Sequence, residues 1–483
     1  MRNLAILSLS LVAVLSACSV GPSFEKPTPH LPQQWHNASA VASSSAAVDP
    51  QWWKQFDDPV LNALVDRALA DNLDLQLAAL RVVESRAQRA IAAGGHWPAI
   101  NANAAYQRER QSEYGVNTRL IDVIGTPNRD RIISALAEPF DVYQGGFDAS
   151  WELDLWGRVR RSVEAADASA AASREDLHDA QVTLIAEVVR TYLELAGTRD
   201  QLRIALDDVA AGSDQLALTE YRVQGGLVAH LDLSVQQAQV ANVRAQIPAL
   251  QQRETVLTHA LAFLLGQDPD ALDAVLAESR TPGAMPALAA GVPSELARRR
   301  PDIRRAEARL HAATAQIGIA VADLYPRISL TGSYGQQSLD ASDFGEWGAR
   351  QWSVGPSLSL PIFSGGRLRA VVDLREIQQQ QAAVSYQRTV LNAWHEIENL
   401  LTAYAAEQQR NRELASVLNA SRDAWQVAHV RYEHGLTNYL VDLDAHRTLL
   451  QAQRAYSESN TQLGIQLVAL YKALGGGWQE DSG

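Results

Sequence analysis

A long segment without helix breakers most constrains what this chain can fold into. Residues 367–433 contain no proline and no glycine, so these 67 residues can form one helix about 100 Å long. The breakers Pro361, Gly365 and Gly366 precede it, and before them residues 352–362 alternate apolar with small or polar side chains, which predicts a strand. A strand that leads into one very long helix does not suit a compact domain.

The order of elements around this segment occurs twice in the chain. Residues that recur 228 positions later include Pro98, Tyr106 and the segment 73–75. Beyond the loop between the strands, Gly226 recurs as Gly435, an offset of 209 residues, so the first copy carries 19 extra residues. Constant offsets on both sides of a single length change indicate an internal duplication.

These patterns divide the chain into six segments. We expect a signal peptide at residues 1–17, a lipidated tether at 18–57 and a first repeat at 58–270. An equatorial connector follows at 271–292, then a second repeat at 293–475 and a tail at 476–483. Strands are predicted near 97–107, 146–156, 325–335 and 352–363, with a polar loop over 107–146. Helices are predicted over 58–94, 158–223, 231–265, 301–323 and 438–474, and the helical hairpins turn near 224–229 and 434–438.

Local signals refine these elements. Asp58 can cap the first helix, Pro59 suits its first position, and Pro248 is a possible kink. Trp52, Trp53 and Phe56 are expected to pin the tether onto the rest of the protein.

The sole cysteine lies at an informative position. Residues 4–17 are almost wholly apolar, the length of a signal-peptide core, and Leu15-Ser16-Ala17-Cys18 follows the pattern of a bacterial lipobox. Cys18 would then carry acyl chains and become the new N-terminus, with Ser19 favouring transfer to the outer membrane. A plain signal peptide cleaved near small residues is the alternative.

Composition and missing motifs exclude several functions. The net charge of −13 argues against nucleic-acid binding, which needs clusters of Lys and Arg. Without Cys-x-x-Cys, His-rich spacing, a phosphate loop or a nucleophile motif, we expect no metal, no cofactor and no enzymatic activity. The mature segment lacks an apolar run of 18 residues, so any membrane crossing would use strands.

The long helices and the strand count bear on assembly. Residues 177–195 carry two apolar stripes, at 177, 184, 188 and 195 and at 182, 185, 189 and 192, which favours neighbours on both flanks as in a cylinder wall; a large globular bundle is the alternative. Four strands cannot close a transmembrane barrel, whereas two copies give about eight and three give about twelve. The chain therefore requires an oligomer, and the wider count is more plausible.

Together these features resemble the TolC-like outer-membrane efflux channels, in particular the NodT-type lipoprotein branch. The residues that carry the resemblance are the lipobox at Cys18, Val20-Gly21-Pro22, Trp52-Trp53, Leu153-Asp154-Leu155-Trp156-Gly157-Arg158, Arg300-Pro301-Asp302-Ile303, Leu360-Pro361-Ile362-Phe363-Ser364-Gly365-Gly366 and the two Gly-Leu turns. No single string is decisive, but their order and the duplication make the resemblance strong over nearly the whole mature chain.

The resemblance implies an α+β fold and a homotrimer. Twelve strands would form an outer-membrane barrel, continued by a long periplasmic α-helical barrel. The protein would be a passive conduit for small molecules, working with a periplasmic adaptor and an inner-membrane pump of the resistance-nodulation-division type. Two alternatives stay open: the duct of a protein secretion system, and a periplasmic coiled-coil scaffold that is not a channel.

The resemblance also implies site residues. The adaptor would dock at the hairpin tips Gly225, Gly226, Leu227, Gly435, Leu436 and Thr437, although each tip could be a turn without a partner. The periplasmic gate would use Asp232, Asp442 and Asp444, although helix-terminal acids favoured by the macrodipole are the alternative. Asp444 matches the family's second gate position, Val441 occupies the first, and Asp442 is shifted by one. Strand–helix joints are expected at Gly157, Pro361, Gly365 and Gly366.

Overall fold

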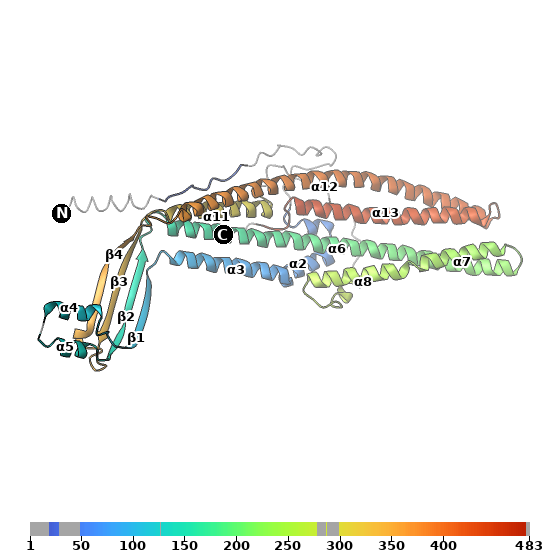
Figure 1. Ribbon diagram of the computed structural model, residues 1–483. Helices are drawn as coiled ribbons and strands as arrows, with labels where there is room; N and C mark the ends of the chain where they lie inside the picture. The colour runs from blue at the N-terminus through green and yellow to red at the C-terminus, as the bar shows by residue number, and fades with distance from the viewer. Residues whose placement is uncertain (1–18, 29–48, 126, 278–285, 287–298, 480–483) are drawn as a thin grey trace. The chain divides into compact units, whose positions relative to one another are not determined.

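A computed structural model of the chain provides the fold (Figure 1). It describes residues 19–28, 49–125, 127–277, 286 and 299–479; Cys18 and most of the predicted connector lie outside them. The chain forms two compact units. One comprises Met1–Glu25, Ser85–Ala170 and Leu310–Ala382, and the other comprises Lys26–Glu84, Ala171–Arg309 and Ala383–Gly483.

The first unit contains one antiparallel sheet of four strands in the order β1-β2-β3-β4. The strands are β1 (Ala99–Glu109), β2 (Phe140–Glu152), β3 (Arg327–Ser338) and β4 (Arg350–Ser359). The register pairs Tyr106 with Tyr143 and Tyr334 with Trp352. Sequential strands therefore pair with each other, both within and between the two repeats.

The second strand differs most from its predicted position near 146–156. β2 begins at Phe140, where it pairs with Glu109, and it ends at Glu152. It stops there because the Asp154 carboxylate turns to the next helix and accepts hydrogen bonds from the N–H groups of Val159 (2.8 Å) and Arg160 (2.9 Å). The apolar alternation that suggested strand up to 156 continues into this capping turn.

The predicted polar loop over 107–146 is wrong in its limits and its content. Only 110–139 connect the strands, and they include α4 (Val116–Ile124) and α5 (Arg129–Leu136). Gly125 ends α4 with a φ of +69°, and Ile133 of α5 is buried. Polar and charged residues hid these short amphipathic helices from a reading that relied on composition.

Two helices of 67 residues each dominate the chain, α6 (Arg158–Gln224) and α12 (Arg367–Glu433). The absence of breakers predicted α12, and α6 continues through Gly197 and Gly212 to within one residue of its predicted end at 223. In Figure 1, α7 (His230–Arg244) and α8 (Ile247–Leu264) run back along α6, and α13 (Tyr439–Ala473) runs back along α12. The break between α7 and α8 falls directly before Pro248, where a kink was predicted.

Shorter helices precede the strands in both repeats. They are α2 (Pro59–Asp71), α3 (Leu73–Gly94) and α11 (Pro301–Ala322), with α9 (Asp273–Ala277), η2 (Trp52–Phe56) and η4 (Trp347–Ala349) as minor elements. The single helix predicted over 58–94 is wrong, because Asn72 adopts an extended backbone between α2 and α3. Its side chain accepts from the N–H of Leu75 (2.8 Å) and donates to the carbonyl of Leu264 (2.8 Å), so it caps α3 and ties it to α8.

The core of the second unit confirms that the aromatic residues before α2 anchor this segment. Trp52, Trp53 and Phe56 are buried among residues of α2, α6, α8, α12 and α13. Trp52 stacks on Tyr471 with ring centroids 4.8 Å apart. Both predicted apolar stripes of α6 also enter this unit's interior, from Val182 to Leu195, so they find their neighbours within one chain.

In the first unit, residues 19–25 pack along two helices. The N–H of Val20 donates to the carbonyl of Trp156 at 3.1 Å, and Phe24 stacks on His311 at 4.3 Å. Gly21 has a φ of +86°, and a Cβ there would lie 2.6 Å from the Cα of Gly318. The Val-Gly-Pro string thus has a steric reason, because only glycine allows this close approach of backbones.

Burial of Tyr471 predicts a loss of stability at alkaline pH. The side chain is fully buried, and this raises its pKa to about 12, against about 10 in an unfolded chain. The native state therefore favours the neutral phenol, and its contribution, about 2–3 kcal/mol, is present below pH ~10 and is lost as the pH rises toward 12. Between about pH 8 and 11, the melting temperature of the detergent-solubilised protein should fall less steeply with pH for Tyr471→Phe than for wild type. Tyr114→Phe, at a 92% exposed residue, should match wild type, and equal slopes for all three proteins would refute the prediction.

Within the described part of the chain, none of the helices combines the length and apolar character needed to span a membrane.

Candidate functional site

The two helical hairpins turn through the same local structure. In the first, Gly226 has a φ of +72°, its N–H donates to the carbonyl of Val223 at 2.9 Å, and the N–H of Leu227 donates to Arg222 at 2.8 Å. In the second, Gly435 has the same φ of +72°, and the corresponding bonds run from Gly435 to Tyr432 and from Leu436 to Arg431, at 2.9 and 2.8 Å. Both ends are Schellman motifs, in which the left-handed residue favours glycine.

The tips expose apolar side chains. Leu227 is 77% and Leu436 is 69% exposed, whereas Thr437 is half-buried. The return helices begin differently: Asn438 caps α13 by accepting from the N–H of Val441 (3.2 Å), whereas Ala229 before α7 offers no side-chain cap. The second return helix therefore has a side-chain cap that the first lacks.

The three carboxylates predicted near the tips occupy different environments. Asp232 lies in the first turn of α7 and is half-buried, and Asp444 lies beyond the first turn of α13 and is exposed. Asp442, in the first turn of α13, is only 5% exposed, and its Oδ1 lies 3.3 Å from Nδ1 of His429 on α12. The structure thus brings Asp442 to a histidine inside the chain and leaves Asp444 facing outward.

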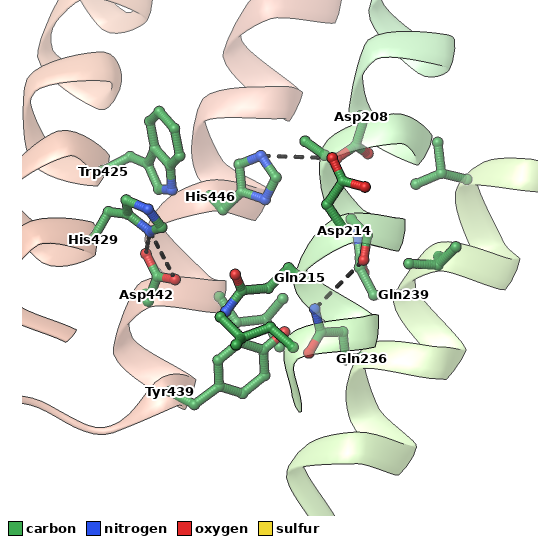
Figure 2. Close-up of a pocket in the computed structure, with 16 residues that line it drawn as sticks. Asp208, Asp214, Gln215, Gln236, Gln239, Trp425, His429, Tyr439, Asp442 and His446 are labelled. Carbon is green, nitrogen blue, oxygen red and sulfur yellow. Dashed lines mark hydrogen bonds and ion pairs between the residues drawn. The ribbon is translucent and has the colours of Figure 1, made fainter. Parts of the chain in front are cut away.

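A cavity of about 420 Å³, lined by both polar and apolar side chains, lies beside Asp442 and is bounded by residues of α6, α7, α12 and α13. Figure 2 shows His446 facing Asp208 of α6 and His429 facing Asp442. The ring of Trp425 stacks on both histidines, with centroids 5.3 Å away in each case. These side chains connect the two hairpins near their turns.

Burial controls the charges in this cluster. It raises the pKa of Asp208 and lowers the pKa of His446, because both side chains lose water that would stabilise their charged forms. Burial and the nearby Asp442 raise the pKa of Tyr439, which also lines the cavity, to about 12. The phenol therefore stays neutral, and the cavity carries carboxylates without a fixed cation among its lining residues.

The sequence reading missed Asp208, Trp425, His429 and His446. A partial signal was present, because Trp425 and His429, like Asp442 and His446, are four residues apart and so share a helix face. The position of Asp208, in the other repeat, could not be deduced from spacing. Among the described residues, no group of three or more His, Cys, Asp or Glu is arranged to hold a metal ion.

The predicted joints lie between strands and long helices. Gly157 precedes α6 with a φ of +80°, and Gly365 and Gly366 precede α12 with φ values of +58° and +81°. Pro361 lies between β4 and these glycines, and it is exposed. Positive φ at the glycines lets the chain turn sharply from strand to helix at a low conformational cost.

The fold therefore defines a duplicated α+β protein in which each repeat joins two strands to a long helical hairpin. The family model for the outer membrane efflux protein matches residues 64–267 and 292–476, most of both repeats. The chain belongs to this family of outer-membrane efflux proteins.

Individual relatives agree with this assignment. The chain is 36% identical over 479 residues to outer membrane protein OprJ of Pseudomonas aeruginosa, covering 98% of this chain and 96% of that protein. It is 34% identical to the pyoverdine export outer membrane protein OpmQ of Pseudomonas putida, covering 100% and 98%. The solved structure of the outer-membrane channel OprN superimposes with a TM-score of 0.86 at 37% identity, covering 95% of this chain and all of that one.

Proposed function

We propose that this chain is the channel subunit of a tripartite efflux system and exports small organic molecules through the outer membrane as a passive conduit. Family membership and the two long hairpins support the role in efflux. The observation that carries the channel is the sheet. Every residue of β1 is exposed, as are most residues of β4, so in a single chain both edge strands of the sheet lack cover.

A trimer would supply pairing partners for the two edge strands of this sheet. β1 and β4 are its edges, and edge strands with unpaired backbone groups pair readily with further strands. Three copies would supply twelve strands, enough to close a barrel, whereas the four of one chain are too few. Exposed apolar side chains, such as Trp352 (72%), Val354 (68%) and Leu358 (68%), would then meet lipid.

We assign the exposed hairpin tips to the adaptor. Leu227 and Leu436 present apolar surface at two turns of the same geometry, and a periplasmic adaptor would connect them to an inner-membrane pump of the resistance-nodulation-division type. Benzophenone attached to Leu227→Cys or Leu436→Cys should crosslink a periplasmic protein in cells. The same label on Tyr114→Cys, at a 92% exposed residue of the other unit, is the control and should not capture that protein.

We further propose that Cys18 is lipidated and anchors the mature chain in the outer membrane. The lipobox motif and the chain's lack of any other cysteine support this assignment. Wild-type protein expressed in cells fed radioactive palmitate should be labelled, and Cys18→Ser should not. Labelling of Cys18→Ser would contradict the proposal.

The channel function is tested in cells that lack the native outer-membrane efflux proteins. Expression of this chain, together with its adaptor and pump, should lower the accumulation of a small fluorescent dye in the cells. The purified protein should conduct ions in planar bilayers. Conductance without dye export, but with secretion of a protein, would favour a secretion duct. A soluble periplasmic monomer without conductance would favour a coiled-coil scaffold.

Asp444 is the strongest of the proposed gate residues, because its carboxylate is exposed in one chain while that of Asp442 is buried beside His429. In a trimer, Asp444 would form a ring of three carboxylates that attracts cations and narrows the entrance, with Asp232 and Asp442 as weaker contributors. Asp444→Ala should raise single-channel conductance and reduce cation selectivity in planar bilayers. Asp423→Ala, an exposed carboxylate on α12, should change neither property. Wild-type conductance and selectivity in Asp444→Ala would remove this residue from the gate.

A further inference from the structure

The cavity between the hairpins has the size of a ligand site. Its volume is about 420 Å³, within the range of roughly 300–1,000 Å³ in which proteins hold small organic molecules. Its walls come from α6 and α7 of the first hairpin and from α12 and α13 of the second. A molecule bound there would contact both hairpins at once.

Asp208 places a buried carboxylate in the wall of the cavity. Its side chain is only 5% exposed, and Oδ2 has no hydrogen-bond partner in the described structure. Oδ1 lies 3.7 Å from Nε2 of His446, too far for a hydrogen bond. A buried carboxylate without a partner is costly, which is why burial raises the pKa of Asp208, and a cation near Oδ2 would stabilise the charged form of the side chain.

No cationic group of the chain pairs directly with this carboxylate oxygen in the described structure. His446 is held toward its neutral form by burial, and His429 is already paired with Asp442. The charge of Arg454 partly offsets the rise in the pKa of Asp208, but its guanidinium donates to Gln246 at 2.6 Å and does not line the cavity; Arg447 donates to Gln239 at 2.9 Å and does not line it either. No arginine or lysine is among the described residues that line the cavity, so a fixed cation bound inside it would come from outside the chain.

The remaining lining favours an organic cation over a metal ion. Trp425 and Tyr439 supply aromatic surface, Tyr439 as a neutral phenol, and aromatic faces attract ammonium groups through their quadrupoles. Gln215 and Gln236 add amide groups that can orient a polar substituent. No cluster of metal-ligating side chains is present in the structured ranges.

We propose that this cavity binds a small organic cation, an aromatic amine or quaternary ammonium compound, with Asp208 as its counter-ion. The carboxylate holds the charged nitrogen, and Tyr439 and Trp425 contact its apolar part. Because the walls belong to both hairpins, the bound cation stabilises their packing against each other.

The test uses the full-length protein in detergent and benzyltrimethylammonium as the probe, with binding measured by isothermal titration calorimetry. Wild type should bind saturably, at one site per chain. Benzyl alcohol and benzenesulfonate, a neutral and an anionic aromatic of similar size, should bind at least tenfold more weakly. Equal binding of all three compounds would reduce the interaction to apolar partitioning and overturn the proposal.

Two substitutions separate the site from the micelle. Asp208→Asn should weaken binding of the cation at least tenfold, whereas Glu413→Gln, at an exposed carboxylate on α12 outside the cavity, should leave it within twofold of wild type. Ala211→Phe, which keeps every charge and fills the cavity from its exposed rim, should abolish binding even if Asp208→Asn fails to fold. Wild-type affinity in a folded Asp208→Asn or Ala211→Phe protein refutes the assignment. These measurements require no transport, so they stand apart from the test of the channel.

Discussion

Replacing Trp52 with alanine should lower the free energy of unfolding by about 3–5 kcal/mol, the usual cost of truncating a large buried aromatic side chain. Trp52 is fully buried, it stacks on Tyr471 at 4.8 Å, and it makes edge contacts with Trp53 (6.1 Å) and Phe56 (6.4 Å). The truncation would leave a cavity where residues before α2 meet α13, and the surrounding helices could close it only in part.

Thermal unfolding of the detergent-solubilised protein, followed by circular dichroism, measures this effect. Trp97→Ala is the matched control, because its side chain is 76% exposed in the chain, and it should shift the melting temperature much less. Trp52→Phe should be intermediate, since it keeps an aromatic ring and removes an indole N–H that has no hydrogen-bond partner among the described residues. Equal melting temperatures for Trp52→Ala and Trp97→Ala would show that Trp52 does not anchor this segment.

Arg300→Ala should lower the free energy of unfolding by about 2–3 kcal/mol, because it removes the hydrogen bonds of a mostly buried guanidinium and leaves the half-buried Asp302 without this donor. The guanidinium is 12% exposed and donates twice to Asp302, at 2.8 and 3.0 Å. It also donates to Glu396 at 2.8 Å and to the carbonyl of Ala473 at 2.8 Å, near the end of α13. Arg300 therefore joins the start of α11 to α12 and α13.

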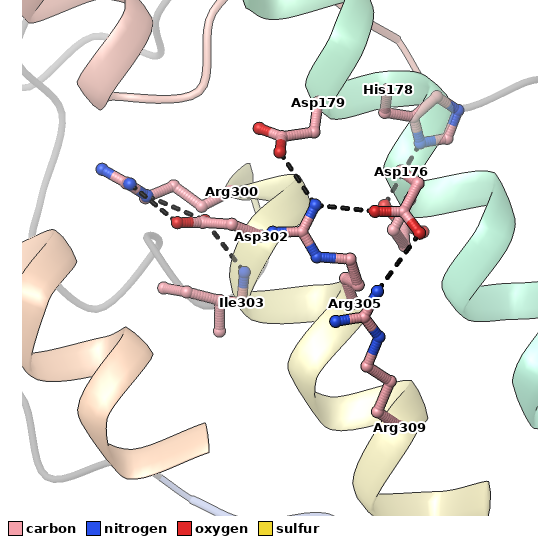
Figure 3. A network of polar contacts seen from close by, with 9 residues as sticks. Asp176, His178, Asp179, Arg300, Asp302, Ile303, Arg305 and Arg309 are labelled. Carbon is pink, nitrogen blue, oxygen red and sulfur yellow. Dashed lines mark hydrogen bonds and ion pairs between the residues drawn. The ribbon is translucent and has the colours of Figure 1, made fainter. Parts of the chain in front are cut away.

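The same network supplies its own control (Figure 3). Arg309, on α11, is 62% exposed and reaches Asp176 at 3.4 Å, so Arg309→Ala should cost less than about 1 kcal/mol. Arg300→Lys keeps the charge but not the two-pronged hydrogen bonding, and it should fall between wild type and Arg300→Ala. A double-mutant cycle of Arg300→Ala with Asp302→Asn should give a coupling energy that the pair Arg309 and Asp302 lacks. Equal losses of unfolding free energy from Arg300→Ala and Arg309→Ala would show that Arg300 contributes no more to stability than an exposed ion pair.

This network also explains one string of the family resemblance in physical terms. Pro301 is the first residue of α11, and the Asp302 carboxylate accepts from the N–H of Ile303 at 2.9 Å. Ile303 is fully buried in the core of the second unit. In Arg300-Pro301-Asp302-Ile303, each residue therefore starts, caps or anchors the same helix.

The hairpins show what a local pattern can and cannot predict about a site. Gly226 and Gly435 were identified from sequence, because a turn between two long helices needs a left-handed residue and the pair recurs after 209 positions. The carboxylates beyond them were also named from sequence. Their environments were not, because exposure of Asp444 and burial of Asp442 depend on which helix packs against each side of α13.

The sequence by itself determined the two helices of 67 residues, the glycine turns, the four strands and the duplication. These features depend on breakers, caps and periodicity within a short window, where the physics is local. Only the tertiary structure decided that residues 110–139 contain helices, that Asn72 interrupts the first helix, and that Asp208 faces His446. Each of these depends on burial or on partners far away in the chain, and residue spacing does not encode which distant helices will meet.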